Sequence, residues 1–420
     1  MSLLTWERPS LKARGWFRQG AASELTPLRM TLVGALLIAV GPLSMSLYTP
    51  AMTLLIDAFH TTEQAIRSTI TVYLFGFAGA QLICGPLSDR FGRRPVMLFC
   101  LSLYVAGSLF CAGAGSVTWL IAGRFVQGIG ACGGVALSRV MVVDRFAGSG
   151  AARIISLMSL ILSIAPAAAP IAGGTLITIT SWRVLFLLLA GYGALLLGLV
   201  WLFPETNERR DPRATRLRSL GVNYAMLLTS RDFVGQVVLT SLAIGGFYAS
   251  QTLAPFVLMG KLGLSSPVFG MVTALLMVSY LLGSLATNRL LHFFTMSRLV
   301  LAGALMVLAA ALILAGGLRF LGLGVVQIMA PMCLWMIGFA FIMPGVTTTA
   351  LGLFPRNAGS ASALMGALQM GMGFVGASLS ALFTDAAQAF AVVPPAMGTL
   401  AVTAYLAANW RRIRTLPAGR

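Results

Sequence analysis

The 420-residue chain contains few charged residues. Only 10% of its residues are charged, against about 25% in soluble globular domains, while 58% are hydrophobic and the mean hydropathy is +0.90. Because a soluble protein needs a charged surface, this composition excludes a soluble domain. It predicts an all-α membrane protein with many crossings, since a helix satisfies its own backbone hydrogen bonds in lipid.

Acidic residues are especially scarce, and none falls in the middle of an expected membrane span. The chain has 11 acidic and 29 basic residues, for a net charge of +18. The basic residues are scattered over short connections instead of forming one patch, which argues against nucleic-acid binding. Short cytoplasmic loops collect Lys and Arg, and this topological bias accounts for the excess of positive charge.

Histidine and cysteine are also rare. The two histidines lie near the ends of expected spans, and the five cysteines lie in apolar runs without CxxC spacing. This pattern argues against disulfides and metal ligands. A membrane-embedded enzyme would need a mid-membrane carboxylate pair, a metal-binding set or a nucleophile with its base. Because the sequence has none of these, we predict no enzyme activity and no cofactor.

Apolar runs bounded by charged or turn residues predict twelve membrane spans. They are expected at residues 30–56, 68–88, 95–114, 117–143, 153–179, 183–203, 233–258, 267–287, 298–317, 321–347, 358–382 and 386–409. Arginines gather on the connections of one side, which predicts that both termini are cytoplasmic. No apolar h-region precedes the first span, so we expect a retained tail instead of a cleaved signal peptide.

A polar linker divides the chain into two related halves. Gly283–Arg289 at the end of span eight repeats the pattern of Gly85–Arg90 at the end of span two, with Thr287 in the place of Asp89. Such repeats are typical of transporters built from two bundles around a midplane site. We expect an N-terminal tail, a first bundle, a cytoplasmic linker, a second bundle and a C-terminal tail at residues 1–29, 30–203, 204–231, 232–409 and 410–420.

The stretch Gly85–Pro95, between spans two and three, is too polar for a helix in hydrocarbon. We expect a tight turn in water or headgroups on the cytoplasmic side. Its sequence resembles the loop between helices two and three of the major facilitator superfamily. The matching residues are Gly85, Leu87, Asp89, Arg90, Gly92, Arg93 and Arg94. The resemblance implies twelve transmembrane helices in two pseudo-symmetric six-helix bundles.

The resemblance also implies an inner gate. In that family an acidic residue at the cytoplasmic end of helix four pairs with this loop, and Asp144 holds that position. The gate would consist of Gly85, Asp89, Arg90, Gly92, Arg93, Arg94 and Asp144. The alternative is a set of solvated surface charges, each of which contributes little.

Arg124 is expected several residues inside span four. Placing a charged side chain there raises the free energy of the membrane-inserted protein by a few kcal/mol, unless the side chain faces protein or a water-filled cavity. One interpretation is an arginine that binds backbone carbonyls and fixes helix four to its neighbours, and the other is a functional cavity group. The segment resembles the family's helix-four pattern at Leu120, Arg124, Gln127, Gly128 and Gly130, which implies proton coupling through Arg124 and Gln127.

Span five contains Pro166, Pro170, Gly173 and Gly174, which remove backbone hydrogen bonds and side-chain bulk. Close helix packing is one explanation. The segment also resembles the helix-five signature of exporters that exchange drug for proton. The match is partial, because alanines stand at the two earlier glycine positions of that signature.

Spans one, six and eleven resemble the Bcr/CflA drug-resistance subfamily, which commonly has an acidic residue in helix one. Here Ser46 occupies the place of that acid, two residues before Tyr48. This difference argues against preference for cationic drugs, because Arg124 and Arg139 leave the centre of the chain positive. From their polar or aromatic character we expect a substrate cavity formed by Ser46, Tyr48, Phe247, Tyr248, Gln251 and Gln369, with Tyr280, Trp335 and Met365 as further candidates.

We therefore predict a transporter of the bacterial inner membrane that exports small amphipathic molecules such as antibiotics. It would use alternating access, exchange substrate for protons and act as a monomer in the lipid bilayer. The alternative is an exporter or facilitator of a neutral or anionic metabolite without proton antiport. The missing acid in span one favours this alternative.

Overall fold

The computed structural model describes residues 26–146, 148–207, 210–212, 214–354 and 357–414. Within these ranges every regular element is a helix, which confirms the predicted all-α class. Eleven helices in the described part of the chain are long and apolar enough to cross a membrane, and α6 adds the apolar segment Pro166–Ile179. Most of the predicted N-terminal tail and the last six residues lie outside the described ranges.

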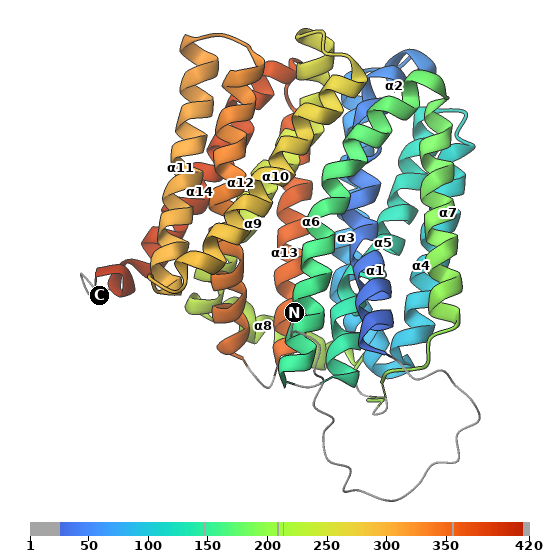
Figure 1. The fold of residues 1–420 in the computed structure, drawn as a ribbon, viewed down its shortest axis with the longest axis vertical. Helices are drawn as coiled ribbons and strands as arrows, with labels where there is room; N and C mark the ends of the chain where they lie inside the picture. Colours follow the sequence, from blue (N-terminus) through green and yellow to red (C-terminus); the bar gives the residue numbers. More distant parts are fainter. Residues whose placement is uncertain (1–25, 147, 208–209, 213, 355–356, 415–420) are drawn as a thin grey trace, which may run out of the picture.

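The helices form two bundles joined by a linker (Figure 1). The first contains α1 (Pro27–Ser46), η1 (Thr49–Ala51), α2 (Met52–Phe59), α3 (Glu63–Phe91), α4 (Arg93–Ala112), α5 (Val117–Arg145), α6 (Gly148–Ile179) and α7 (Trp182–Trp201). The linker contains α8 (Leu217–Thr229), a helix that we did not predict. The second bundle contains α9 (Arg231–Ala254), η2 (Pro255–Lys261), α10 (Ser266–Leu290), α11 (Met296–Phe320), α12 (Val325–Gly352), α13 (Ala358–Ala381) and α14 (Ala386–Arg414).

The two bundles meet along two equivalent pairs of helices. Helix α3 packs against α13, and α6 packs against α10. In each pair the second membrane crossing of one bundle contacts the fifth crossing of the other. This reciprocal contact is the arrangement that a pseudo-two-fold axis between related halves produces.

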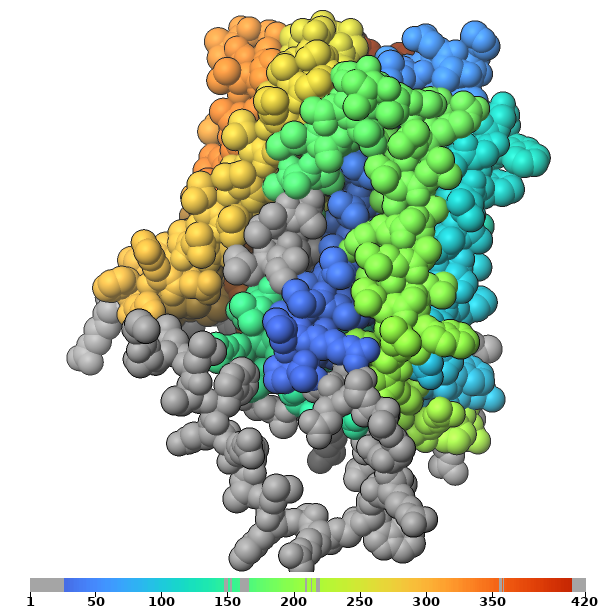
Figure 2. All heavy atoms as spheres, turned by 45° about the vertical axis from the view of Figure 1, so that its right-hand side comes forward, coloured from blue at the N-terminus to red at the C-terminus, as the bar shows by residue number. Residues whose placement is uncertain are grey.

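The α6–α10 pair is closed at one end and spread at the other. We call the end of the molecule that carries α8 the linker end and the opposite end the far end. Helices α6 and α10 touch at the far end and diverge toward the linker end (Figures 1 and 2). The space between the bundles is therefore sealed by helix packing on one side of the molecule.

The stretch Gly85–Pro95 is not the tight turn that we predicted. Helix α3 continues to Phe91 and α4 begins at Arg93, so that only Gly92 lies outside a helix. Gly92 has a φ of 106°, a backbone conformation that residues with a Cβ rarely adopt. The charged residues are accommodated on helix ends, where they bind one another and the linker.

Candidate functional site

A cavity of about 490 Å³ lies between the two bundles. Helices α1, α5 and α6 line it on one side, and α9, α10 and α12 line it on the other. Aromatic and methionine side chains form much of its apolar wall, and polar side chains lie among them. The lining side chains include Met45, Ser46, Thr49, Arg139, Ser156, Phe247, Tyr248, Gln251, Met277, Tyr280, Ser284, Asn288, Met336 and Phe339. Such a wall suits a bulky apolar ligand with a few polar groups.

Arg139 is the one charged side chain among the described residues that line this cavity. It is exposed to the cavity, and no described side chain forms a hydrogen bond or ion pair with its guanidinium. The acidic residues of the described chain lie at helix ends or in connections, away from the cavity wall. The described residues also contain no group of three His, Cys, Asp or Glu that could hold a metal.

The structure brings only some of the predicted cavity residues together. Ser46, Phe247, Tyr248, Gln251 and Tyr280 line the cavity, and Pro166 of the helix-five set joins them. Tyr48, Gln369, Trp335 and Met365 do not. The indole ring of Trp335 is fully buried against α9 and α14, beside Gly246 and Gly398.

Tyr48 and Gln369 make contacts elsewhere in the bundles, which explains why they do not line the cavity. Tyr48 lies just beyond α1 and turns into the first bundle, where its hydroxyl lies 2.8 Å from the Thr69 hydroxyl. The Gln369 amide instead approaches the sulfur of Met343 on α12, at 3.9 Å. The sequence gives no hint of these orientations, because helices that are apolar all round do not reveal which face meets the cavity.

A closed ring of hydrogen bonds surrounds Arg124 and joins α1, α4 and α5. Arg124 Nη1 donates to the Ser44 carbonyl at 3.3 Å and to Gln127 Oε1 at 2.6 Å. Gln127 Nε2 donates to Ser108 Oγ at 2.7 Å, and Ser108 Oγ donates to the Tyr104 carbonyl at 2.7 Å. The Tyr104 hydroxyl lies 2.6 Å from Ser44 Oγ and completes the ring.

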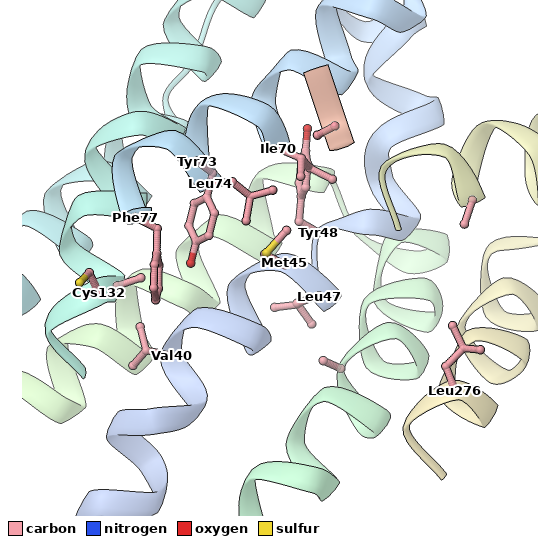
Figure 3. Close-up of a cluster of buried hydrophobic side chains, with 14 of the residues drawn as sticks. Val40, Met45, Leu47, Tyr48, Ile70, Tyr73, Leu74, Phe77, Cys132 and Leu276 are labelled. Atoms are coloured by element: carbon pink, nitrogen blue, oxygen red, sulfur yellow. The ribbon is translucent and has the colours of Figure 1, made fainter. Parts of the chain in front are cut away.

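The positive charge of Arg124 is stabilised by cation–π contacts with two aromatic rings, and not by an ion pair with a described carboxylate. The guanidinium carbon lies 4.7 Å from the centre of the Tyr48 ring and 4.3 Å from that of Tyr73. Both tyrosines belong to a cluster of buried hydrophobic side chains that also includes Leu276 of α10 (Figure 3). Each cation–π contact contributes about 0.5–2 kcal/mol, more where water is excluded. Because Arg124 Nε and Nη2 remain without hydrogen-bond partners, this buried cation is incompletely satisfied.

The glycines of the helix-five set seal the far end of the cavity. A Cβ at Gly174 would collide with the Ser266 carbonyl at the start of α10, and a Cβ at Gly173 would collide with the Leu47 carbonyl after α1. A Cβ at Gly270 of α10 would in turn meet the Pro170 carbonyl. Gly174 and Gly270 therefore allow the two bundles to touch backbone to backbone, while Gly173 allows α6 to approach the chain after α1 in its own bundle.

Arg67 closes the other helix pair at the far end. It is fully buried, and its Nη1 donates to the carbonyls of Ser380 and Phe383 at 3.4 and 3.2 Å, while Nη2 lies 2.5 Å from Glu63 Oε2. These carbonyls lie in and just after the last turn of α13, where a cation is also favoured by the helix dipole. The sequence does not show that Arg67 reaches the other bundle, because both carbonyls lie more than 300 residues away along the chain.

The residues of the predicted inner gate gather at the linker end. Arg93 Nη1 lies 2.5 Å from Asp89 Oδ1, and Arg93 Nε donates to Asp144 Oδ2 at 3.0 Å. The Glu205 carboxylate accepts hydrogen bonds from the backbone N–H groups of Arg93 and Arg94 at 2.9 and 3.2 Å. Glu205, which we did not predict as a site residue, therefore caps the start of α4.

The other gate candidates also contact the first bundle or the linker. Arg90 donates to Thr215 Oγ1 at 2.6 Å, and Arg94 donates to the Trp201 carbonyl. A Cβ at Gly85 would meet no atom within 4 Å. In this conformation, therefore, no neighbouring helix lies so close to residue 85 that a glycine is required there. In the described part of the chain, the hydrogen bonds and ion pairs of this cluster join α3, α4, α5 and the linker, and none reaches the second bundle.

Comparison with known proteins places the chain in a large group of relatives. The sequence pattern of the Major Facilitator Superfamily matches residues 34–377. The chain is 30% identical to multidrug resistance protein D of Escherichia coli over 383 residues, which cover 90% of this chain and 95% of that protein. It is 26% identical to a bicyclomycin resistance protein homolog of Haemophilus influenzae over 390 residues, which cover 90% and 96%.

Two solved structures show the same fold at low sequence identity. The nucleoside transporter NupG aligns with a TM-score of 0.71 at 12% identity, over 91% of this chain and 99% of that one. The xylose transporter XylE from Escherichia coli, in a partially occluded inward-open conformation, aligns with a TM-score of 0.70 at 17% identity, over 93% and 98%.

Proposed function

The chain belongs to the Major Facilitator Superfamily and is a multi-pass membrane transporter rather than an enzyme, and from this premise we propose that it exports small amphipathic molecules. Relatives named for multidrug and bicyclomycin resistance support an antibiotic or drug as the substrate. The protein acts as a monomer in the inner membrane of a bacterium, since one chain supplies both bundles.

The cavity between the bundles is the observation that carries this proposal. It is large enough for a drug-sized molecule, and its aromatic and methionine side chains adapt to varied apolar shapes. Its position between two related bundles is the position in which transporters of this architecture hold their substrates.

In this proposal the linker end faces the cytoplasm, and both termini lie there. Arginines at this end support the orientation, since short cytoplasmic segments collect them; described examples are Arg90, Arg94, Arg145, Arg153, Arg210 and Arg289. The described conformation then faces inward, with its far end closed by the α6–α10 and α3–α13 contacts. Export requires the bundles to rock, so that these contacts break while the linker end closes.

Exchange of substrate for protons, coupled to bundle motion by Arg124 and Gln127, is the proposed driving reaction. The buried ring around Arg124 supports it, because displacement of a neighbour would leave a cation in an apolar interior and couple the charge to bundle motion. A second candidate is export or facilitated diffusion without protons. The absence of acidic residues from the described cavity wall favours that alternative.

Everted membrane vesicles with a respiration-driven pH gradient test the proposal. Phenicols, neutral drugs, cationic dyes and organic anions are added in turn while a fluorescent probe reports the gradient. We expect at least one compound to collapse the gradient only in vesicles that contain this protein. If labelled compounds cross without disturbing the gradient, the uncoupled alternative is correct, and if none crosses, the export proposal is wrong.

A further inference from the structure

We propose that Arg139 is the substrate's ionic anchor and that the preferred substrate is a monovalent aromatic carboxylate. This inference rests on the proposed export function and specifies the chemical class that the cavity selects. It starts from one observation, namely that Arg139 reaches the cavity and that no described side chain pairs with it.

The position of Arg139 argues against a simple surface role. It lies six residues before the end of α5, or about 9 Å along the helix axis, and its side chain joins Tyr280 in the cavity wall. Arginines that merely mark the cytoplasmic side are expected on helix ends, as Arg145 is. A guanidinium held inside the cavity without a partner has unused hydrogen-bond donors directed at whatever enters.

No acidic residue is available to neutralise this charge. The nearest acid on the same helix is Asp144, and it is bound to Arg93 at 3.0 Å and to Thr206 Oγ1 at 3.3 Å. Residues 154–179, which supply the adjacent wall from α6, contain no charged residue in the sequence, and the same is true of residues 233–254 and 325–352. Among the described residues, the titratable groups that share the cavity wall with Arg139 are thus the phenols of Tyr248 and Tyr280.

The rest of the wall specifies the remainder of the ligand. A guanidinium donates two parallel hydrogen bonds to a carboxylate, which one arginine can neutralise completely. A phosphate monoester carries more charge than one cation can balance. Phe247, Tyr248, Tyr280 and Phe339 offer ring surfaces, and Asn288 of α10 offers an amide from the wall opposite the helix that carries Arg139. One negative charge on an aromatic body therefore fits this cavity.

Binding of two matched compounds to the purified full-length protein tests the inference. Tritiated 2-naphthoate and 2-naphthamide share a ring system and differ in charge. We expect naphthoate to bind at least tenfold more tightly, and Arg139→Gln to weaken naphthoate at least tenfold while naphthamide binding stays unchanged. Arg139→Lys should keep part of the preference. Arg145→Gln, which removes a charge from the end of the same helix, should have no effect.

Three results would overturn the inference: equal affinity of the wild type for both compounds, an equal loss of both in Arg139→Gln, or binding of neither. Unchanged naphthamide binding by Arg139→Gln also shows that the variant is folded. Failure of this inference differs from failure of the export function. If the vesicles export neutral or cationic compounds but the wild type shows no preference for naphthoate, transport stands and the anionic class is wrong.

Discussion

The hydroxyl of Tyr224 on α8 donates a hydrogen bond to the carbonyl of Leu82 on α3, at 2.8 Å. Pro86, four residues after Leu82, has no N–H, so that this carbonyl lacks its normal helical donor. The linker helix therefore supplies the bond that the proline removes. This hydrogen bond connects the linker between the two bundles to α3.

A double-mutant cycle tests this relationship. Tyr224→Phe leaves the Leu82 carbonyl without a donor and should destabilise the protein by about 1–3 kcal/mol. Pro86→Ala restores the N–H, so that Tyr224→Phe made in that background should cost clearly less. Thermal unfolding of the four proteins in one detergent measures the coupling. Equal effects of Tyr224→Phe in both backgrounds would contradict the assignment.

Removing Arg67 should loosen the far end. Arg67→Gln removes a charged donor from the last carbonyls of α13, and hydrogen bonds to charged groups contribute about 1.5–3 kcal/mol each. We expect amide hydrogen exchange around residues 63–70 and 378–386 to accelerate at least tenfold. Arg183→Gln is the matched control, because Arg183 binds the Ala114 carbonyl of its own bundle at 3.3 Å. Similar acceleration in both variants would exclude a specific closing role for Arg67.

A methyl group at Gly174 should force α6 away from α10. Its Cβ would meet the Ser266 backbone, which cannot move aside as a flexible side chain can. Overpacking of this kind costs about 1–3 kcal/mol, so we expect Gly174→Ala to lower transport at least fivefold. Gly191→Ala on the exposed side of α7, where a Cβ meets no atom within 4 Å, should transport normally. Normal transport by Gly174→Ala would show that this contact is dispensable.

Arg124→Gln should abolish proton-coupled transport and leave membrane insertion intact. The variant keeps an amide that can donate a hydrogen bond to Gln127, but it loses the positive charge between the aromatic rings of Tyr48 and Tyr73. Arg124→Lys should also transport at less than about a tenth of the normal rate, because an ammonium cannot reproduce the planar fork. Vesicle assays and size-exclusion profiles provide the measurement, with exposed Arg319→Gln as control. Normal activity in Arg124→Gln would remove this residue from the mechanism.

Hydropathy and charge were sufficient to predict the helices, because long apolar runs in lipid have few alternatives to helix. The stretch Gly85–Pro95 shows the limit of that reasoning. Its charges suggested a turn, whereas the i,i+4 pair of Asp89 and Arg93 and the cap from Glu205 let the helices continue almost to each other. Contacts between residues 112 positions apart in the sequence cannot be read from local composition.

The sequence predicted the kinds of side chain that line the cavity better than it predicted which particular residues point into it. Ser46, Tyr248 and Gln251 were expected in the cavity and lie there, whereas Tyr48 faces Thr69 inside the first bundle. The rotation of each helix is decided by packing of small and large side chains between helices, as where Trp335 fills the space beside Gly246 and Gly398. These pairings join distant segments, so that one sequence without its structure does not reveal them.

The positive charge of Arg139, the one charged side chain among the described residues of the cavity wall, has an electrical consequence. Cells hold their interior negative, and each elementary charge that crosses 100 mV gains or loses about 2.3 kcal/mol. A substrate anion that leaves with its charge neutralised only by fixed Arg139 carries one negative charge outward, down that potential. At 100 mV the gain corresponds to roughly a fifty-fold concentration ratio, since about 1.4 kcal/mol is tenfold. Because the described cavity wall has no carboxylate, the membrane voltage alone suffices to drive export of such an anion, even where no pH difference exists.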